Sequence, residues 1–397
     1  MLNYEEALAV VLSSAKSFGQ ETIKLDQSLG RIIAEDIFSD RDYPPFNRAS
    51  MDGYAILTAD FENGKKELFC IRTILAGQIC TDVLQSGECF KIMTGAAVPD
   101  GIDAVIRVED SAFAELAYRV SFNVPNVKKF QNIALKGQDT LANTLVLPKG
   151  TRVTPQVIGT LATFGKGNIV VEKLPRVTII STGDEIIDVD EHVSNVTIRN
   201  SNQYVLQAML KAFKIEKIKL KLIKDNKSQL REKLKKAVSN SDILLMSGGV
   251  SAGDADFVPQ ILQEVGVEKI FHKINIRPGK PIWFGKKPDG CTVFALPGNP
   301  LSCQTTFKIF VEPFLVKCFG SSPPEMFRFP MATQRIKKTN LDEFFPVALY
   351  GTPTQVHQKK FNGSGDITAG LFAEGMAWQC YDKMILEKGD NIIVFLF

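Results

Sequence analysis

The 397-residue chain is poor in the side chains that bind transition metals or move protons near neutral pH. It has three histidines, at positions 192, 272 and 357, and seven cysteines that form no CxxC pair. Scattered cysteines in odd number are typical of reduced thiols rather than of a disulfide framework or a zinc site. The chemistry of this chain is therefore expected to use carboxylates, hydroxyl groups, lysines, arginines and backbone amides.

Long apolar runs and a strong charge of one sign are also missing. No stretch reaches the roughly 18–20 apolar residues that span a bilayer, and Lys+Arg 47 against Asp+Glu 44 leaves a net charge of only +3. Glu5 and Glu6 stand where a signal peptide would carry lysines and an apolar core. We expect a cytoplasmic protein that binds neither a membrane nor a nucleic acid.

The length predicts two to four domains, because one hydrophobic core rarely serves a chain of this size. Residues 3–18 are apolar at helical spacing and predict an amphipathic helix. Residues 45–140 consist of short apolar runs broken by Gly, Pro and Asn, which predicts a β-rich domain. Residues 144–172 contain a further short strand, a helix-like stretch and the apolar run NIVVE.

From about residue 174 the pattern alternates between buried strands and amphipathic helices. The expected strands are 176–181, 217–223, 242–247, 268–276 and 291–296, and the expected helices are 201–213, 228–240, 255–266 and 300–319. This order predicts a doubly wound α/β domain with parallel strands and right-handed crossovers. A proline-rich break, SSPPE (321–325), then leads into a tail, 326–397, whose short alternating strands predict a small β domain.

Four loops of unusual composition lie at or beside the carboxyl ends of these strands, where doubly wound sheets bind ligands. They are STGDE (181–185), SGGVSAGDAD (247–256), RPGKP (277–281) and LPGNPLS (296–302). Each alone could be an ordinary turn or a tight strand–helix connection. Their convergence on one edge of a sheet favours a binding site.

The second loop combines glycines with acids. Gly248, Gly249 and Gly253 would let backbone N–H groups close around phosphate oxygens, but Asp254 and Asp256 would repel a phosphate by about 4 kcal/mol at roughly 4 Å. A bound Mg²⁺ would turn this repulsion into attraction, since it binds carboxylates and phosphate oxygens together without histidine or cysteine. The loop predicts a magnesium–phosphate site, with Glu185 as a further candidate ligand.

Positive charge follows in the third and fourth loops, where Lys273, Arg277, Lys280 and Ser302 could form a second oxyanion site. The front half has acids of its own in turn-like stretches. They are Asp52 in PPFNRASMDGYAI and Asp139 in KGQD, and the stretch KIMTGAAVP places Thr94 after an expected strand. Spacing alone does not tell whether these residues face the α/β loops.

Together these stretches resemble the molybdopterin molybdenumtransferase (MoeA) family, whose relatives include the C-terminal domain of gephyrin. The matching segments, in the family's order, are PPFNRASMDGYA, KIMTGAAVPDGIDAVIRVED, KGQD, STGDEI, IRNSNQYVL, MSGGVSAGDADF, RPGKP and LPGNPLS. Arg277 stands where many members have lysine, and Asp254 where many have glutamate. Gly365 and Asp366, in the tail, depart from a more apolar family pattern.

The resemblance implies a multidomain α/β protein. Its parts would be a discontinuous linking domain (1–44 with 141–173), a β-rich insert domain (45–140), a molybdopterin-binding α/β domain (174–320) and a β-barrel-like C-terminal domain (321–397). It also implies a homodimer whose active site combines the α/β domain of one subunit with the β insert of the other. The implied reaction inserts molybdate into adenylyl-molybdopterin, with Mg²⁺-dependent release of AMP.

The resemblance, carried onto the residues, also implies site roles. The expected catalytic residues are Asp52, Thr94, Asp139, Glu185, Asp225 and Asp256, and the Mg²⁺ ligands are Glu185, Asp254 and Asp256. Lys273, Arg277, Lys280 and Ser302 would bind molybdate. The substrate would contact Thr182, Gly183, Asp184, Ser247, Gly248, Gly249, Ser251, Gly253, Pro297, Gly298, Asn299 and Pro300.

Two other functions remain alternatives. A molybdopterin adenylyltransferase shares the α/β domain, but it needs no insert carrying MDGYA, and such an enzyme could instead be a partner of this chain. A scaffold on the same framework would tolerate the loss of the acids, all of which are present here. A preference for tungstate over molybdate is also left open by the sequence.

Overall fold

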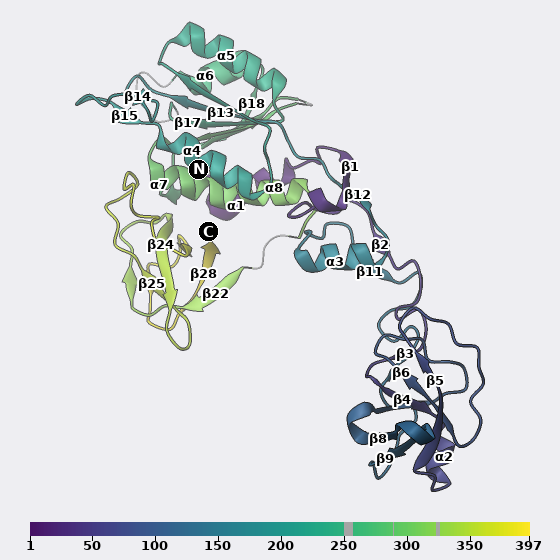
Figure 1. The fold of residues 1–397 in the computed structure, drawn as a ribbon. Helices are drawn as coiled ribbons and strands as arrows, with labels where there is room; N and C mark the ends of the chain where they lie inside the picture. Colours follow the sequence, from purple (N-terminus) through teal and green to yellow (C-terminus); the bar gives the residue numbers. More distant parts are fainter. Residues whose placement is uncertain (250–256, 289, 323–325) are drawn as a thin grey trace. The chain divides into compact units, whose positions relative to one another are not determined.

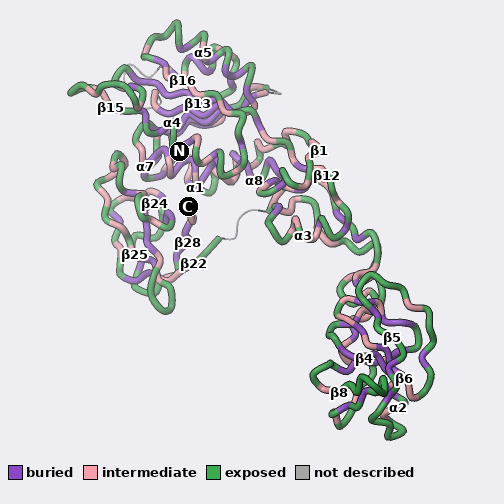
Figure 2. Tube along the Cα trace, viewed as in Figure 1, coloured by how far each residue is buried: buried purple, intermediate pink, exposed green. Residues whose placement is uncertain are grey.

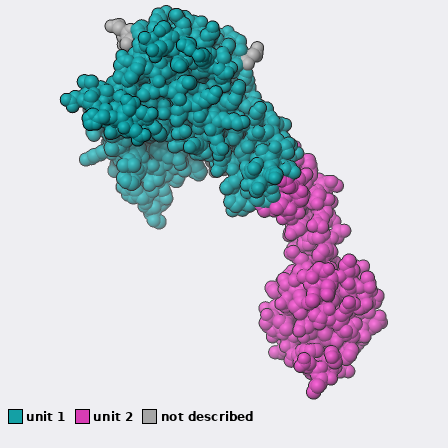
Figure 3. Space-filling view, turned by 45° about the horizontal axis from the view of Figure 1, so that its top comes forward, with its two compact units in different colours: residues 1–35, 149–158, 168–397 teal, residues 36–148, 159–167 magenta. Residues whose placement is uncertain are grey.

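A computed structural model of the chain describes residues 1–249, 257–288, 290–322 and 326–397. The chain forms two compact units (Figure 3). Unit 1 comprises Met1–Glu35, Lys149–Ile158 and Asn168–Phe397, and unit 2 comprises Asp36–Pro148 and Gly159–Gly167. The finer domain boundaries expected from the sequence stay a prediction. No described helix is long and apolar enough to cross a membrane.

Unit 2 is built around a six-stranded sheet in the order β7-β4-β6-β5-β9-β8 (Figure 1). Its strands are β4 (Gly53–Ile56), β5 (Glu67–Ile74), β6 (Glu88–Ile92), β7 (Ala104–Arg107), β8 (Ser111–Ala114) and β9 (Arg119–Phe122). Successive side chains of β4 pack in different hydrophobic clusters, one on each face of the sheet. Ala55 packs in one cluster while Tyr54 and Ile56 pack in the other, as the two-residue period of a strand requires. Short pairs, β2 (Ile37–Phe38) with β11 (Leu145–Leu147) and β3 (Arg48–Ala49) with β10 (Ile133–Ala134), and the helix α2 (Thr58–Glu62) complete the unit.

The α/β part of unit 1 has a six-stranded sheet in the order β16-β13-β17-β21-β20-β18. The strands are β13 (Val177–Thr182), β16 (Ile218–Ile223), β17 (Ile243–Ser247), β18 (Glu268–His272), β20 (Trp283–Lys286) and β21 (Thr292–Leu296). Helix α5 (Lys227–Asn240) and helix α6 (Val258–Glu264) pack over one face, and α4 (Ser201–Ala212), α7 (Pro300–Thr306) and α8 (Glu312–Cys318) pack over the other. The central strands are buried along their whole length (Figure 2). The doubly wound fold expected from the sequence is confirmed.

The expectation that all strands run parallel is wrong for β20. This strand pairs antiparallel with both β21 and β18, so the other five strands share one direction. The connections explain the reversal, because residues 273–282 and the short connection after Lys286 show no helix where they are described, and a parallel neighbour requires a longer crossover. The predicted strand 268–276 also ends early, at His272, because Lys273 takes a left-handed backbone conformation with φ 65°. The carboxyl end of β18 still lies at the same sheet edge as those of β13, β17 and β21.

Two predicted helices are shorter than expected. The first, α1 (Tyr4–Ser13), begins with a capping box made by Asn3 and Glu6. It ends where the hydroxyl groups of Ser13 and Ser14 both donate to the carbonyl of Val10. The predicted helix 300–319 is divided into α7 and α8 by a π-helical turn, Phe307–Val311. The nearby Pro313 explains the turn, since it has no N–H to continue the α-helical ladder.

The C-terminal part of unit 1 is a sheet in the order β19-β24-β26-β28-β22, with β25 also paired to β24. Its strands are β19 (Ile276–Arg277), β22 (Phe327–Pro330), β24 (Asp342–Tyr350), β25 (Gln355–Gln358), β26 (Gly375–Gln379) and β28 (Asn391–Leu396), and β23 (Arg335–Ile336) pairs with β27 (Ile385–Leu386). The edge strand β19 comes from the α/β segment and pairs in parallel with β24, so that Arg277 lies opposite Glu343. The rings of Tyr4 and Phe344 pack edge to face, 5.1 Å apart. These contacts fasten the C-terminal sheet to the α/β part.

The remaining short elements are β1 (Gln20–Lys24) paired with β12 (Asn168–Glu172), the helix α3 (Pro155–Thr163), and the pair β14 (Ile186–Ile187) and β15 (Ile198–Arg199).

Candidate functional site

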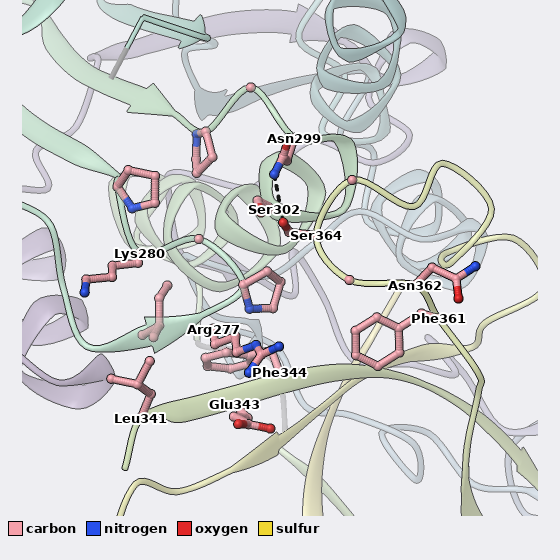
Figure 4. A pocket seen from close by; sticks show the side chains of 18 of the residues that line it. Arg277, Lys280, Asn299, Ser302, Leu341, Glu343, Phe344, Phe361, Asn362 and Ser364 are labelled. Carbon is pink, nitrogen blue, oxygen red and sulfur yellow. Dashed lines mark hydrogen bonds between the residues drawn. The ribbon is translucent and has the colours of Figure 1, made fainter. Parts of the chain in front are cut away.

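A pocket of about 960 Å³ opens in unit 1 at the carboxyl-end edge of the α/β sheet. Many of the residues singled out from the sequence line it, namely Thr182, Gly183, Glu185, Asp225, Gly248, Gly249, Arg277, Lys280, Pro297, Gly298, Asn299 and Ser302. The opposite wall comes from the C-terminal part of the chain, and Figure 4 shows several of these side chains together. The loops predicted to converge do so where the structure describes them.

The loop after β13 supplies an acid and an unpaired hydroxyl group. Thr182 is only 5% exposed, and its Oγ1 has no hydrogen-bond partner among the described residues. A Cβ atom on Gly183 would lie 2.6 Å and 2.8 Å from the two carboxylate oxygens of Glu185, so the carboxylate folds back over this glycine. Both groups line the pocket, and a buried hydroxyl without a partner costs free energy unless a ligand satisfies it.

Asp184 is not one of the described residues that line the pocket, but it holds the loop in place. Its Oδ1 accepts a hydrogen bond of 3.0 Å from the backbone N–H of Asp225. The ammonium group of Lys224 donates to the backbone carbonyls of Asp184 and Ile186, at 2.9 Å and 2.8 Å. These bonds tie the loop after β13 to the end of β16, and they bring Asp225 to the pocket wall.

The loop after β17 begins with two glycines in left-handed conformations, Gly248 with φ 94° and Gly249 with φ 69°. A Cβ on Gly248 would meet the carbonyl oxygen of Thr182 at 2.7 Å. A Cβ on Gly249 would meet Val258 Cγ2 at 2.5 Å and Thr182 Oγ1 at 2.9 Å. Only glycine therefore fits at these two positions, and both glycines line the pocket.

Ser247 lies behind these glycines and is buried, with 4% exposure. Its Oγ accepts a 2.7 Å hydrogen bond from Asn202 Nδ2, which also donates to the carbonyl of Gly298 at 2.7 Å. Asn202, on α4, thus joins the loops after β17 and β21. The sequence reasoning did not single it out, and only its place in the segment IRNSNQYVL could have drawn attention to it.

Four of the predicted residues, Ser251, Gly253, Asp254 and Asp256, lie outside the described residues. Among the residues that are described, no three histidines, cysteines or acids are grouped so that they could hold a metal ion. The metal ligands expected in the second loop therefore stay a prediction.

The loop between β18 and β20 brings cations to the other end of the pocket. Arg277 and Lys280 are exposed and line the pocket. Lys273 does not line it among the described residues, and its backbone N–H donates to the carbonyl of Ile282. Ser302, on α7, is buried yet reaches the pocket, while Pro300 only begins that helix.

The C-terminal part adds a wall that the sequence reasoning missed. Arg335, Lys337, Lys338 and Glu343 line the pocket, together with the segment 361–365. Arg335 and Glu343 form a 2.7 Å ion pair with both side chains about nine-tenths buried. Burial lowers the pKa of Lys337, whose ammonium group donates to the backbone carbonyls of Leu341 and Cys380. The dipeptide Lys337-Lys338 and the glycine-rich stretch NGSG are the only sequence signals that could have indicated this wall.

Charge is unevenly distributed along the pocket. In the sheet order, the acids Glu185 and Asp225 follow β13 and β16, whereas Arg277 and Lys280 belong to the β18–β20 connection at the other side. The glycines after β17 and the loop after β21 lie between them. This arrangement suits an elongated anion, one end of which could share a cation with the acids while the other end meets arginine and lysine.

The predicted residues Asp52, Thr94 and Asp139 all belong to unit 2. Asp52 Oδ1 accepts hydrogen bonds from the backbone N–H and the hydroxyl of Thr94, at 2.6 Å and 2.7 Å. These two bonds lower the pKa of Asp52 and keep its carboxylate ionised. Asp139 is exposed, and its backbone N–H donates to the carbonyl of Tyr43.

Comparison with known proteins gives the family. Residues 2–165 match the model of the MoeA N-terminal region (domain I and II), and residues 178–317 match that of a probable molybdopterin binding domain. A molybdopterin molybdenumtransferase from Staphylococcus aureus strain Mu50 is 34% identical over 400 residues, covering 99% of this chain and 94% of the relative. The chain belongs to the MoeA family. The resemblance seen in the motifs is therefore confirmed.

Other MoeA relatives agree in sequence and in fold. A molybdopterin molybdenumtransferase from Staphylococcus epidermidis strain RP62A is 33% identical over 347 residues, covering 86% of this chain and 80% of the relative. The crystal structure of a molybdopterin biosynthesis MoeA protein from Pyrococcus horikoshii OT3 matches with a TM-score of 0.86 and 28% identity, over 100% of both chains. The multidomain α/β architecture is thus shared with a solved MoeA structure.

Proposed function

We propose that this chain inserts molybdate into adenylyl-molybdopterin and releases AMP in a reaction that requires Mg²⁺. The coarser statement, a transferase of molybdenum cofactor biosynthesis, follows from its membership of the MoeA family. The single observation that carries the finer proposal is the separation of charge along the pocket, with acids after β13 and β16 and cations on the β18–β20 connection. A pterin phosphate joined to AMP, accompanied by molybdate, is an elongated anion whose pyrophosphate could share Mg²⁺ with the acids while molybdate meets the cations.

The described residues at the acidic end fit a magnesium ion. The carboxylate of Glu185 and the unpaired hydroxyl of Thr182 both line the pocket beside the glycines, and oxygen ligands without histidine or cysteine are what Mg²⁺ prefers. We propose that Glu185 holds the ion together with Asp254 and Asp256. Bound there, Mg²⁺ would supply Lewis-acid stabilisation of the charge that develops on the leaving phosphate.

The basic end would receive molybdate, a tetrahedral dianion. Arg277, Lys280 and Ser302 are the residues proposed to hold it through charge-assisted hydrogen bonds. Lys338 on the facing wall adds a further cation, whereas the charge of Arg335 is balanced by Glu343. Of the four residues expected from the sequence to bind molybdate, Lys273 has the least support, since it is absent from the described pocket lining.

A homodimer with a shared active site, in which Asp52, Thr94 and Asp139 of one subunit serve the substrate held by the other, is part of this proposal. So is a transient association with a molybdopterin adenylyltransferase, since that class of enzyme makes the adenylylated substrate. Both rest on the family resemblance.

The proposed function predicts that purified protein mixed with adenylyl-molybdopterin releases AMP only when molybdate and Mg²⁺ are both present. Asp256→Ala should then lower the rate by about a hundredfold or more, because charge stabilisation by the ion is lost, while the circular dichroism spectrum stays unchanged. Full activity in that variant would remove the metal assignment. Binding of the nucleotide without AMP release would indicate a scaffold, and formation of the nucleotide from ATP would indicate an adenylyltransferase.

Thr182→Val tests the role of the unpaired hydroxyl. Valine has nearly the same shape, so we expect unchanged or slightly higher stability, since an unsatisfied buried hydroxyl is removed. Affinity for adenylyl-molybdopterin, measured by titration calorimetry, should fall about tenfold because the ligand loses a hydrogen bond to a charged group.

Thr178→Val, in the same strand, is the matched control. Its hydroxyl is already paired with Ser241 Oγ at 2.6 Å, so this variant should lose about 1 kcal/mol of stability and none of its affinity. The opposite result, with Thr182→Val less stable and equally tight in binding, would assign the Thr182 hydroxyl to the fold.

A further inference from the structure

The segment 361–370, between β25 and β26, forms part of the C-terminal wall of the pocket. Its first five residues line the pocket. The two ends of the segment are anchored in the hydrophobic core, since Ala369 is 4% exposed within the main core cluster and Phe361 packs against it. Between these anchors the chain contains Gly363 and Gly365, which have little intrinsic preference for one conformation. Something other than apolar packing must therefore hold the middle of the segment.

The carboxylate of Asp366 does so. Its Oδ2 accepts a 2.9 Å hydrogen bond from the backbone N–H of Asn362, and its Oδ1 accepts bonds of 2.8 Å from both the backbone N–H and the hydroxyl of Thr368. These bonds lower the pKa of Asp366, so the ionised form is the one that the turn binds. Three donors from both sides of the carboxylate thus close residues 362–368 into a single turn.

Ser364 lies at the middle of this turn and is connected to the α/β part. Its Oγ accepts a 2.8 Å hydrogen bond from Asn299 Nδ2, drawn as a dashed line in Figure 4. Asn299 belongs to the loop after β21, which lines the same pocket. Since Ser364 Oγ is the acceptor in this bond, its own O–H is left to donate to an anion in the pocket.

We propose that Asp366 is a positioning residue for the anionic substrate of this pocket. By closing the turn 362–368, it keeps Ser364 against Asn299 and fixes the C-terminal wall beside the loop after β21, which leads to Ser302. The proposal rests on the proposed function, because it takes molybdate as the anion. It also gives a role to the one stretch of the tail, Gly365-Asp366, that departs from the family pattern.

The test is Asp366→Asn, which keeps the size of the side chain but turns one acceptor into a donor that faces an N–H group. We expect the KM for molybdate in AMP release to rise about tenfold, as the loss of one or two hydrogen bonds would cause, while kcat changes by less than about twofold. Amide hydrogen exchange in residues 362–368 should become faster, and the melting temperature should stay the same. Thr368→Ser, which keeps both donors, should behave like the unaltered protein.

Asp390→Asn is a matched control. Asp390 is also a turn carboxylate of the C-terminal part, accepting a 2.9 Å bond from the backbone N–H of Glu387, but it is absent from the described pocket lining. This variant should leave the KM for molybdate unchanged. An equal rise in KM for both variants, or no rise for Asp366→Asn, would overturn the positioning role.

Failure of the proposed function would be recognised separately. If the unaltered protein releases no AMP, the reaction is wrong, and the positioning role is then decided by titrating molybdate alone into the unaltered protein and the Asp366→Asn variant. Weaker binding by the variant supports the proposal, and equal or absent binding in both overturns it.

Discussion

Gly249→Val is expected to weaken the binding of adenylyl-molybdopterin by about a hundredfold or more, the largest effect on binding that we anticipate for one substitution. The backbone of Gly249 has φ 69°, a conformation that a β-branched residue adopts only under strain. Its Cβ would also lie 2.5 Å from Val258 Cγ2 and 2.9 Å from Thr182 Oγ1. The added side chain would therefore displace the loop or occupy the space that the phosphate needs. Titration calorimetry with the nucleotide measures the effect.

Substitutions at two other glycines are the controls, and they show whether the loss of affinity is specific to Gly249. A Cβ on Gly167 would meet nothing within 4 Å, and a Cβ on Gly298, in the same pocket, would come no closer than 3.5 Å to Gly248 Cα. Gly167→Ala should leave affinity unchanged, and Gly298→Ala should lower it only slightly. If Gly249→Val folds normally and binds the nucleotide with full affinity, backbone N–H groups at this loop do not surround a phosphate.

Glu343→Ala is expected to lower the free energy of unfolding by about 3 kcal/mol at pH 7, because it removes the acid that balances the charge of the buried Arg335 guanidinium. The ion pair is 2.7 Å long with 11% and 9% of the two side chains exposed. Glu343 also accepts a 2.7 Å bond from the hydroxyl of Thr339. Its charge also acts on Arg277, so its removal takes an acid away from both arginines.

The pH dependence of unfolding checks the cause. Burial alone would raise the pKa of Glu343, but hydrogen bonds from Arg335 and Thr339 outweigh burial, and the pKa is lowered from its ordinary value of 4.5. The carboxylate therefore stabilises the fold fully above its unfolded pKa, and this contribution is lost as the pH falls through the lower folded pKa. In urea unfolding, the difference in free energy of unfolding between the unaltered protein and Glu343→Ala should become smaller below about pH 4.

An exposed pair is the control for this substitution. Glu67 and Arg119 form a 3.3 Å ion pair with more than half of each side chain exposed, so Glu67→Ala should cost less than about 1 kcal/mol. If the loss of unfolding free energy in Glu343→Ala stays constant down to pH 3, lost packing and not lost charge destabilises the variant.

Much of the α/β part could be predicted from the sequence, because its pattern is local. The fully apolar runs at β13, β17 and β21 are typical of strands buried on both faces, and caps such as Asn200 and Asn226 mark the starts of α4 and α5. Strand β20 itself was not predicted, because Trp283–Lys286 is a short run without alternation. Its orientation follows from the length of the connections on either side.

The wall made by Arg335, Lys337, Glu343 and the turn around Asp366 could not be predicted from local pattern. Its position depends on the pairing of Arg277 with Glu343, two residues far apart in sequence, and on the packing of Tyr4 against Phe344. Such contacts depend on which apolar surfaces fit together, and this cannot be predicted from a short stretch of sequence.

By itself the sequence determined the family, the doubly wound sheet and the loops at its edge, since strand pattern and glycine placement act over a few residues. Only the tertiary structure decided that Glu185 and Asp225 line one pocket with Arg277 and Lys280, and that the C-terminal sheet forms its second wall. The second wall forms because β19 leaves the α/β segment to pair with β24, a contact between residues far apart in sequence.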